Sequence, residues 1–341
     1  MKKVRFGLTL LLCFALWFTV TSCFNTHPEY ISTGNKTHNI HMIVKMNRGE
    51  YWNTVKQGAE AAAKEFNVNL TFKAPNSESD VDDQVQMVED SIAAKADVII
   101  LAASSYMGLA QVVDKASYYK IPVISVDAEV GSARVTTYVG SNSYEAGQKS
   151  AERLIQLLNG YGDIGIINFT NASSHEDGES SSSMDIGARD ADEREKGFLN
   201  YTARYPEVHV VQISYTNSEI SDAEELTRLM LIKHPDLRGI ATLNEIASQG
   251  AAKVIQNSGL DKIKMVAFDS SPAMMELLQD GTVQATVIQN PFSNGYLAVK
   301  HAVEVTEGID VPERVDTGTK LIDLDNMLWP ENQKLLFPFV R

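Results

Sequence analysis

From residue 39 onward, the hydrophobic positions alternate between short apolar runs and sets of residues spaced three or four apart. Continuous or alternating runs are typical of strands, whereas the wider spacing places residues on one face of a helix. In the first part of the chain the pattern predicts helices from Trp52 to Phe66, from Val81 to Ile92 and at 107–118, with strands at 39–46, 68–72, 98–103, 122–127 and 137–141. This order predicts a parallel sheet covered by helices on both faces.

A second series of the same kind begins with a helix at about 144–158. The pattern then predicts helices at 191–203, 220–230 and 247–255 and strands at 163–169, 208–213, 238–244 and 264–269. The repetition predicts an α/β protein of two lobes, each a doubly wound parallel sheet, joined by a hinge. A length of 341 residues with 44% hydrophobic content fits two domains with separate cores.

One buried strand in each series ends in an aspartate. Asp127 follows PVISV, and Asp269 follows KMVAF. Open parallel sheets bind ligands beyond the carboxyl ends of their strands, so we expect the two carboxylates to face one cleft. The alternative is that each aspartate is a turn or helix-cap residue.

The beginning of the chain has the layout of a secretory signal. Three basic residues precede the apolar run Phe6 to Val20, which is shorter than the roughly 20 residues that a membrane-spanning helix needs. We predict a signal peptide at 1–22 and a lipidated N-terminus with a flexible spacer at 23–37. Cys13 would leave with the signal, and Cys23, the second of the two cysteines, would then have no disulfide partner.

Cys23 ends the tetrapeptide Val-Thr-Ser-Cys, which resembles the bacterial lipobox. The resemblance implies that lipid on Cys23 anchors an extracytoplasmic lipoprotein to the cell membrane, because two or more acyl chains hold a protein there stably. The alternative is a plain signal peptide that is cleaved nearby. Either reading places the protein outside the cytoplasm.

The net charge and the lack of catalytic motifs argue against several classes of function. The chain has 30 Lys and Arg against 44 Asp and Glu, a formal charge of −14, which argues against nucleic acid or an anionic lipid surface as the main partner. It has no phosphate loop, no G-x-S-x-G, no H-E-x-x-H and no histidine beside a candidate nucleophile. We therefore expect neither an enzyme nor a cofactor.

Residues 39–325 resemble the type I periplasmic binding proteins of the ribose-binding group, which deliver sugars to ABC transporters. Seven segments in the family's order carry the resemblance: IVKMNRGEYWNTVKQGAE, IPVISVDAE, VGSNSYEAG, EREKGF, HPDLRGIATLNE, MVAFDSSP and ATVIQNPFSNG. The resemblance implies a fold of two lobes that close over a sugar by bending at a three-strand hinge. It also implies lobe boundaries, namely 38–141 with 291–316 for the N-terminal lobe and 142–290 with 317–341 for the C-terminal lobe.

The resemblance also implies a set of ligand-binding residues. Five positions match residue types that hydrogen-bond sugar hydroxyls in the family: Asp127, Arg194, Asn244, Asp269 and Gln289. Tyr51 and Trp52 match aromatic residues that stack on sugar rings, although Trp52 also fits the core face of its helix. Lys45 matches a lysine found in several sugar binders and in autoinducer-2 receptors, the alternative being a solvated residue at a strand edge.

Two departures limit the choice of ligand. Ala128 stands where the ribose binder has an arginine, which argues against ribose. Residues 172–190 form a longer, acidic, serine-rich stretch that predicts a mobile loop near the cleft. A metal site there, from His175, Glu176, Asp177 and Asp185, is less favoured than a solvated loop because the spacing does not converge on one centre.

The sequence thus predicts a lipid-anchored solute-binding protein that captures a sugar or polyol by hinge closure and presents it to an ABC transporter permease. The alternative is a receptor for a sugar or autoinducer-2 whose closed form engages a histidine kinase or a chemoreceptor. Both use the same cleft and differ in the partner protein.

Overall fold

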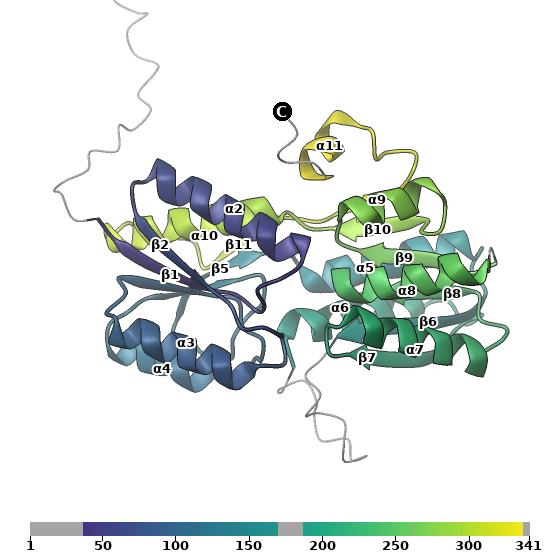
Figure 1. Ribbon diagram of the computed structural model, residues 1–341, viewed down its shortest axis with the longest axis horizontal. Coiled ribbons are helices and arrows are strands. Elements are labelled where there is room, and N and C mark those ends of the chain that lie inside the picture. The colour runs from purple at the N-terminus through teal and green to yellow at the C-terminus, as the bar shows by residue number, and fades with distance from the viewer. Residues whose placement is uncertain (1–36, 170–186, 261, 337–341) are drawn as a thin grey trace, which may run out of the picture. The chain divides into compact units, whose positions relative to one another are not determined.

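The computed structural model describes residues 37–169, 187–260 and 262–336, which contain two six-stranded sheets. The strand order is β11-β5-β4-β3-β1-β2 in one sheet and β12-β10-β9-β8-β6-β7 in the other. All neighbouring strands pair in parallel except β10 and β12. We call each sheet with its covering helices a lobe, and the predicted two-lobed α/β fold is confirmed (Figure 1).

The first lobe contains β1 (Asn39–Ile43), α2 (Glu50–Glu65), β2 (Asn69–Lys73), α3 (Val81–Ala93), β3 (Val98–Leu101), α4 (Ala110–Tyr118), β4 (Val123–Val126), β5 (Val135–Gly140), α10 (Pro291–Thr306) and β11 (Arg314–Asp316). The second lobe contains α5 (Ser143–Leu157), β6 (Gly162–Phe169), α6 (Arg189–Thr202), β7 (Val208–Thr216), α7 (Ile220–Lys233), β8 (Gly239–Thr242), α8 (Glu245–Ser258), β9 (Lys264–Phe268), α9 (Pro272–Gln279), β10 (Ala285–Ile288), β12 (Lys320–Ile322) and α11 (Pro330–Leu336). The chain therefore passes between the lobes after β5, after β10 and after β11.

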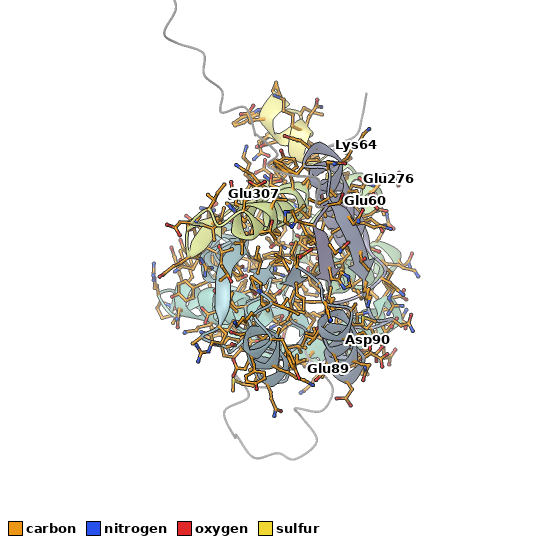
Figure 2. All side chains as sticks on the ribbon, turned by 90° about the vertical axis from the view of Figure 1, so that its left-hand side faces the viewer. Glu60, Lys64, Glu89, Asp90, Glu276 and Glu307 are labelled. Carbon is orange, nitrogen blue, oxygen red and sulfur yellow. The ribbon has the colours of Figure 1, made fainter. Side chains whose placement is uncertain are left out.

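Each sheet is buried on both faces, as the continuous apolar runs predict. In β3, Ile100 packs in the cluster that includes α2 and α10, whereas its neighbour Ile99 packs in the cluster that includes α3 and α4. In β6, Ile166 packs with α5 and α6, whereas Ile167 packs with α8. Charged side chains cover the outside, among them the exposed Glu60, Lys64, Asp90, Glu276 and Glu307 (Figure 2).

The structure differs from the predicted elements mainly at element ends and near the C-terminus. The first strand ends at Ile43 rather than at residue 46, and Lys45 lies in the bend that follows. The helix predicted at 107–118 starts at Ala110, because Ser105 Oγ accepts the N–H of Gly108 (3.0 Å) and holds the preceding residues in a turn. Among the described residues, no helix is both long and apolar enough to cross a membrane.

In each lobe, glycines allow two helices to pack closely against each other. In the second lobe, a Cβ at Gly147 of α5 would lie 1.9 Å from the carbonyl oxygen of Arg194, and one at Gly197 of α6 would lie 2.0 Å from that of Tyr144. The first lobe repeats this contact between α2 and α10, which lie side by side in Figure 1. Since the obstructing atoms are backbone, only a shift of the helices could accommodate a larger residue.

We expect Gly147→Ala to lower the free energy of unfolding by about 2–3 kcal/mol, because the added methyl group separates α5 from α6 at Arg194. Urea denaturation followed by circular dichroism measures the change. Glu152→Ala, at an exposed position of the same helix, is the matched control and should change the free energy by less than about 0.5 kcal/mol. Equal stability of the two variants would contradict the close contact.

Candidate functional site

The two strand-end aspartates occupy equivalent positions in the two lobes. Asp127 follows β4 and Asp269 follows β9, both with left-handed backbone, at φ values of 63° and 61°. The N–H of Asp127 donates to the carbonyl of Val139 (2.9 Å), and that of Asp269 donates to the carbonyl of Val287 (2.8 Å). A non-glycine residue in this conformation needs the surrounding structure to hold it.

Side-chain hydroxyls of the next strand complete this arrangement. Tyr138 Oη donates to the carbonyl of Asp127 (2.8 Å), and Thr286 Oγ1 donates to the carbonyl of Asp269 (2.7 Å). Both aspartates are thus fixed at the carboxyl ends of their sheets by the same backbone and side-chain contacts, as their place in the sequence predicts.

A small cavity of about 30 Å³ lies between the two lobes. It is lined by all eight residues that the sequence predicts to bind the ligand: Lys45, Tyr51, Trp52, Asp127, Arg194, Asn244, Asp269 and Gln289. The structure therefore brings the whole predicted set together. Tyr51 and Trp52 lie in α2 and Arg194 lies in α6, Asn244 precedes α8, and the other four residues follow β1, β4, β9 and β10. That they bind a ligand stays a prediction.

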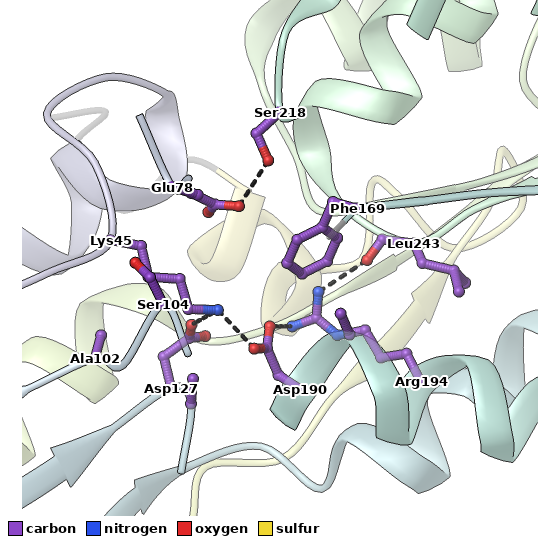
Figure 3. A network of polar contacts seen from close by, with 12 residues as sticks. Lys45, Glu78, Ala102, Ser104, Asp127, Phe169, Asp190, Arg194, Ser218 and Leu243 are labelled. Carbon is purple, nitrogen blue, oxygen red and sulfur yellow. Dashed lines mark hydrogen bonds and ion pairs between the residues drawn. The ribbon is translucent and has the colours of Figure 1, made fainter. Parts of the chain in front are cut away.

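Lys45 is the centre of the polar network drawn in Figure 3. It is 1% exposed, and its Nζ lies 2.6 Å from Asp190 Oδ1 and 3.5 Å from Asp127 Oδ2. Burial by itself lowers the pKa of Lys45, but the charges of Asp190, Asp127 and Glu78 outweigh it and leave the pKa raised. Lys45 is therefore a buried cation paired with both lobes rather than a solvated edge residue.

Arg194 extends the network into the second lobe. Its guanidinium lies 3.4 Å from Asp190 and donates to the carbonyl of Leu243 (2.8 Å) (Figure 3). The ring of Phe268 lies 4.5 Å from the guanidinium carbon. Burial raises the pKa of Asp190, but Lys45 and Arg194 outweigh this and leave the pKa lowered. Nε of Arg194 is buried and has no hydrogen-bond partner among the described residues.

The aromatic pair lies at the start of α2. Tyr51 and Trp52 are 7% and 5% exposed, and their rings meet edge to face at 5.0 Å. Tyr51 Oη donates to Asp127 and accepts from Asn294 Nδ2 (3.0 Å). Both rings line the cavity and also belong to the core of the first lobe, so the two roles that the sequence suggests for Trp52 are compatible.

Three polar residues face the cavity from the second lobe. Gln289 Nε2 donates to Asp269 Oδ1 (3.0 Å). Burial raises the pKa of Asp269 to about 7, although Arg194 and the hydrogen bond from Gln289 oppose the shift. Asn244 caps α8, with Oδ1 accepting the N–H of Ala247 (2.8 Å), which fixes the orientation of its side-chain amide.

The structure adds acidic residues that the sequence analysis did not select. Asp190 stands one helical turn before Arg194, a spacing that would have revealed the pair on α6. Glu245 of the second lobe accepts the backbone N–H groups of Tyr51 (3.1 Å) and Glu50 (3.3 Å), at the N-terminus of α2 in the first lobe. Glu78 accepts a hydrogen bond from Ser218 Oγ across the lobes (2.7 Å). No local sequence pattern predicts the contacts of Glu245 and Glu78.

Several predictions concern residues outside the described ranges. These are the signal peptide at 1–22, lipidation of Cys23, and the solvated loop that we favour over a metal site of His175, Glu176, Asp177 and Asp185 in the serine-rich stretch. Within the described ranges, no group of three His, Cys, Asp or Glu residues is arranged to hold a metal ion. Ala128, the departure from the ribose binder, is fully buried beside Asp127.

Two parallel-sheet lobes with a polar cavity between the carboxyl ends of their strands define the class of two-lobed binding proteins. The periplasmic binding protein domain matches residues 40–310, and the chain belongs to this family.

Curated relatives align with nearly the whole chain. The ribose import binding protein of Bacillus subtilis is 23% identical over 94% of this chain and 98% of its own length. A D-ribose/D-allose-binding protein of Pseudomonas aeruginosa is 25% identical over 82% of this chain and 85% of that protein.

Solved structures agree with the fold. A carbohydrate transporter solute-binding protein of Agrobacterium radiobacter, in complex with D-arabinose, has a TM-score of 0.82 at 26% identity and covers 89% of this chain and 100% of its own. An ABC transporter solute-binding protein of Agrobacterium vitis with bound D-fucose has a TM-score of 0.80 at 28% identity, with coverage of 87% and 99%. These relatives are binding proteins of transport systems rather than enzymes, and the family is extracytoplasmic.

The raised pKa of Asp269 predicts how the stability of the folded protein changes with pH. An unfolded aspartate ionises near pH 4, whereas the folded one keeps its proton up to about pH 7, so Asp269 makes the protein less stable as pH rises through that window. Asp269→Asn keeps the acceptor for Gln289 and removes the titration. Relative to the native protein, the variant should therefore gain up to about 1.4 kcal/mol per pH unit between about pH 4 and 7.

Thermal unfolding of both proteins at pH 5, 6, 7 and 8, chosen around the value of about 7 for Asp269, measures this gain. Asp310→Asn, at an exposed position, controls for the change in net charge. A difference in melting temperature between Asp269→Asn and the native protein that stays constant with pH would show that Asp269 is not protonated in the folded state.

Proposed function

We propose that the protein is an extracytoplasmic, lipid-anchored solute-binding protein that captures a sugar or sugar-like polyol and delivers it to an ABC importer. The observation that carries the proposal is the convergence of eight family-matched residues from both lobes on one buried polar cavity. Relatives of known ligand support the substrate class, since two of them bind D-arabinose and D-fucose.

The residues around the cavity suit hydroxyl groups. A hydroxyl both donates and accepts, so the side-chain oxygens of Asp127 and Asp269 can accept hydrogen bonds from its O–H while Arg194, Lys45 and Gln289 donate to its oxygen. Hydrogen bonds with charged groups contribute about 1.5–3 kcal/mol each. The cavity also holds the acids Asp190, Glu78 and Glu245, and this excess of carboxylates disfavours a strongly anionic ligand such as a sugar phosphate.

Capture requires the lobes to move. A volume of about 30 Å³ has room for about two water molecules, so a sugar enters when the lobes separate and is enclosed when they return. We propose that the bending occurs where the chain passes between the lobes, with boundaries at 141/142, 290/291 and 316/317. Strand membership supports these boundaries, because β5, β10 and β11 end just before them.

Sugar binding is tested by thermal shift and calorimetry with D-ribose, D-allose, D-arabinose, D-fucose, D-galactose, D-glucose, inositols and autoinducer-2. A ligand that binds the folded state raises its melting temperature by mass action. Asp127→Ala and Arg194→Ala should each weaken binding of the best compound by about 100-fold or more, because each removes charged hydrogen bonds.

Arg153→Ala is the matched control, since Arg153 is paired with Asp323 away from the cavity. It should bind like the native protein, and far-ultraviolet circular dichroism should show all three variants folded. Unchanged affinity in both site variants would remove the site assignment. Saturable binding combined with normal uptake in a deletion strain would favour the alternative role as a receptor for a histidine kinase or chemoreceptor.

The lipid anchor is tested separately from the cleft. Cys23→Ala removes the residue that carries the lipid. Without acyl chains the protein loses most of its membrane affinity, so it should move from the membrane fraction to the soluble extracytoplasmic fraction. Ser22→Ala keeps both the cysteine and a small residue before it and should remain with the membrane. Persistent membrane association of Cys23→Ala would place the tether elsewhere.

A further inference from the structure

A second and larger cavity adjoins the sugar site. It has a volume of about 270 Å³ and lies between Tyr138 and Arg314 of the first lobe and Tyr144, Arg189 and Glu193 of the second. We call it the crossover chamber, because Ser141 and Asn142, where the chain first passes between the lobes, also line it. Of the eight family-matched residues, Asp127 alone lines it.

The crossover chamber and the sugar site share one wall. Asp127 and Asp190 line both cavities, and Lys45 bridges the two carboxylates from the side of the sugar site (Figure 3). A sugar ring bound by Asp127 and Asp190 therefore has the sugar site on one side and the chamber on the other. A substituent on a ring carbon near these carboxylates would project into the chamber.

Each of the two arginines that line the chamber is paired with a glutamate of its own lobe. Arg314 pairs with Glu129 in the first lobe, and Arg189 pairs with Glu193 in the second (3.0 Å). With Asp127 and Asp190 on the shared wall, the described lining holds four carboxylates against two guanidinium groups, which disfavours a phosphate or carboxylate ligand. Each guanidinium has five N–H donors, of which its ion pair engages only part, so the lining offers both donors and acceptors to neutral hydroxyl groups.

We propose that the crossover chamber is a second subsite, which takes an uncharged, hydroxyl-rich group attached to the sugar, so that the preferred ligand is a disaccharide or other glycoside rather than a free monosaccharide. This inference rests on the proposed sugar-binding function. Because both lobes line the chamber, contacts of the second group would also stabilise the closed form.

Calorimetry with matched pairs tests the subsite: D-glucose against maltose and cellobiose, D-galactose against lactose and melibiose, and each pentose against its methyl glycosides. At least one glycoside should bind about tenfold or more tightly than the free sugar it contains, which corresponds to one additional hydrogen bond to a charged group. If every glycoside binds more weakly than its free sugar, the site encloses a single ring and the subsite does not exist.

Two variants fill the chamber from different lobes, so a folding defect in one of them does not decide the test. Glu193→Trp fills the chamber from α6, and Glu129→Trp fills it from the first lobe. Each should reduce glycoside affinity to that of the free sugar, while free-sugar affinity stays within about threefold of the native value. Lys196→Trp and Glu313→Trp, at exposed positions outside the chamber, are the matched controls and should leave both affinities unchanged.

The outcomes separate this inference from the proposed function. Free-sugar binding with no gain for glycosides, and no effect of either chamber variant, leaves the sugar-binding function intact and overturns the subsite. Absence of binding to every sugar and glycoside overturns both.

Discussion

Burial of Lys45 between the lobes is the constraint on which the rest of the site depends. A cation that is 1% exposed must be paired, and its partners come from both sides, Asp127 from the first lobe and Asp190 from the second. The lobes can therefore meet in few relative positions without leaving a charge unpaired. Asp190 in turn holds Arg194, so one buried ammonium fixes the placement of the polar groups that would face a ligand.

The two lobes reach this arrangement by the same local means. Each holds an aspartate in left-handed backbone after a buried strand and anchors its carbonyl with a hydroxyl of the adjacent strand. Each also supports its sheet with a pair of helices that approach closely at glycines. In the second lobe this approach lies at Arg194, so tight helix packing directly positions a site residue. Fold stability and site geometry are coupled there.

The parts of the site that could be predicted from the sequence are those with a local signal. Asp127 and Asp269 follow apolar strands, and family motifs identified six further residues of the cavity lining. Glu245 and Glu78 carried no such signal, because their partners lie 194 and 140 residues away along the chain and meet them only when the lobes approach. The pairing of β12 with β10 was missed for a different reason, since a strand of three residues is too short to show a hydrophobic period.

The contact of Glu245 joins the second lobe to the helix that carries the aromatic residues of the site. Helix α2 begins after Gly49, which has no side chain to cap it, and the carboxylate of Glu245 accepts N–H groups of its first turn from the other lobe. A carboxylate also interacts favourably with the positive end of the helix dipole. These N–H groups belong to Glu50 and Tyr51, and the ring of Tyr51 reaches Asp127. The contact between the lobes thus caps the same helical turn that carries Tyr51 and Trp52, so this contact and the ordered aromatic pair stabilise each other.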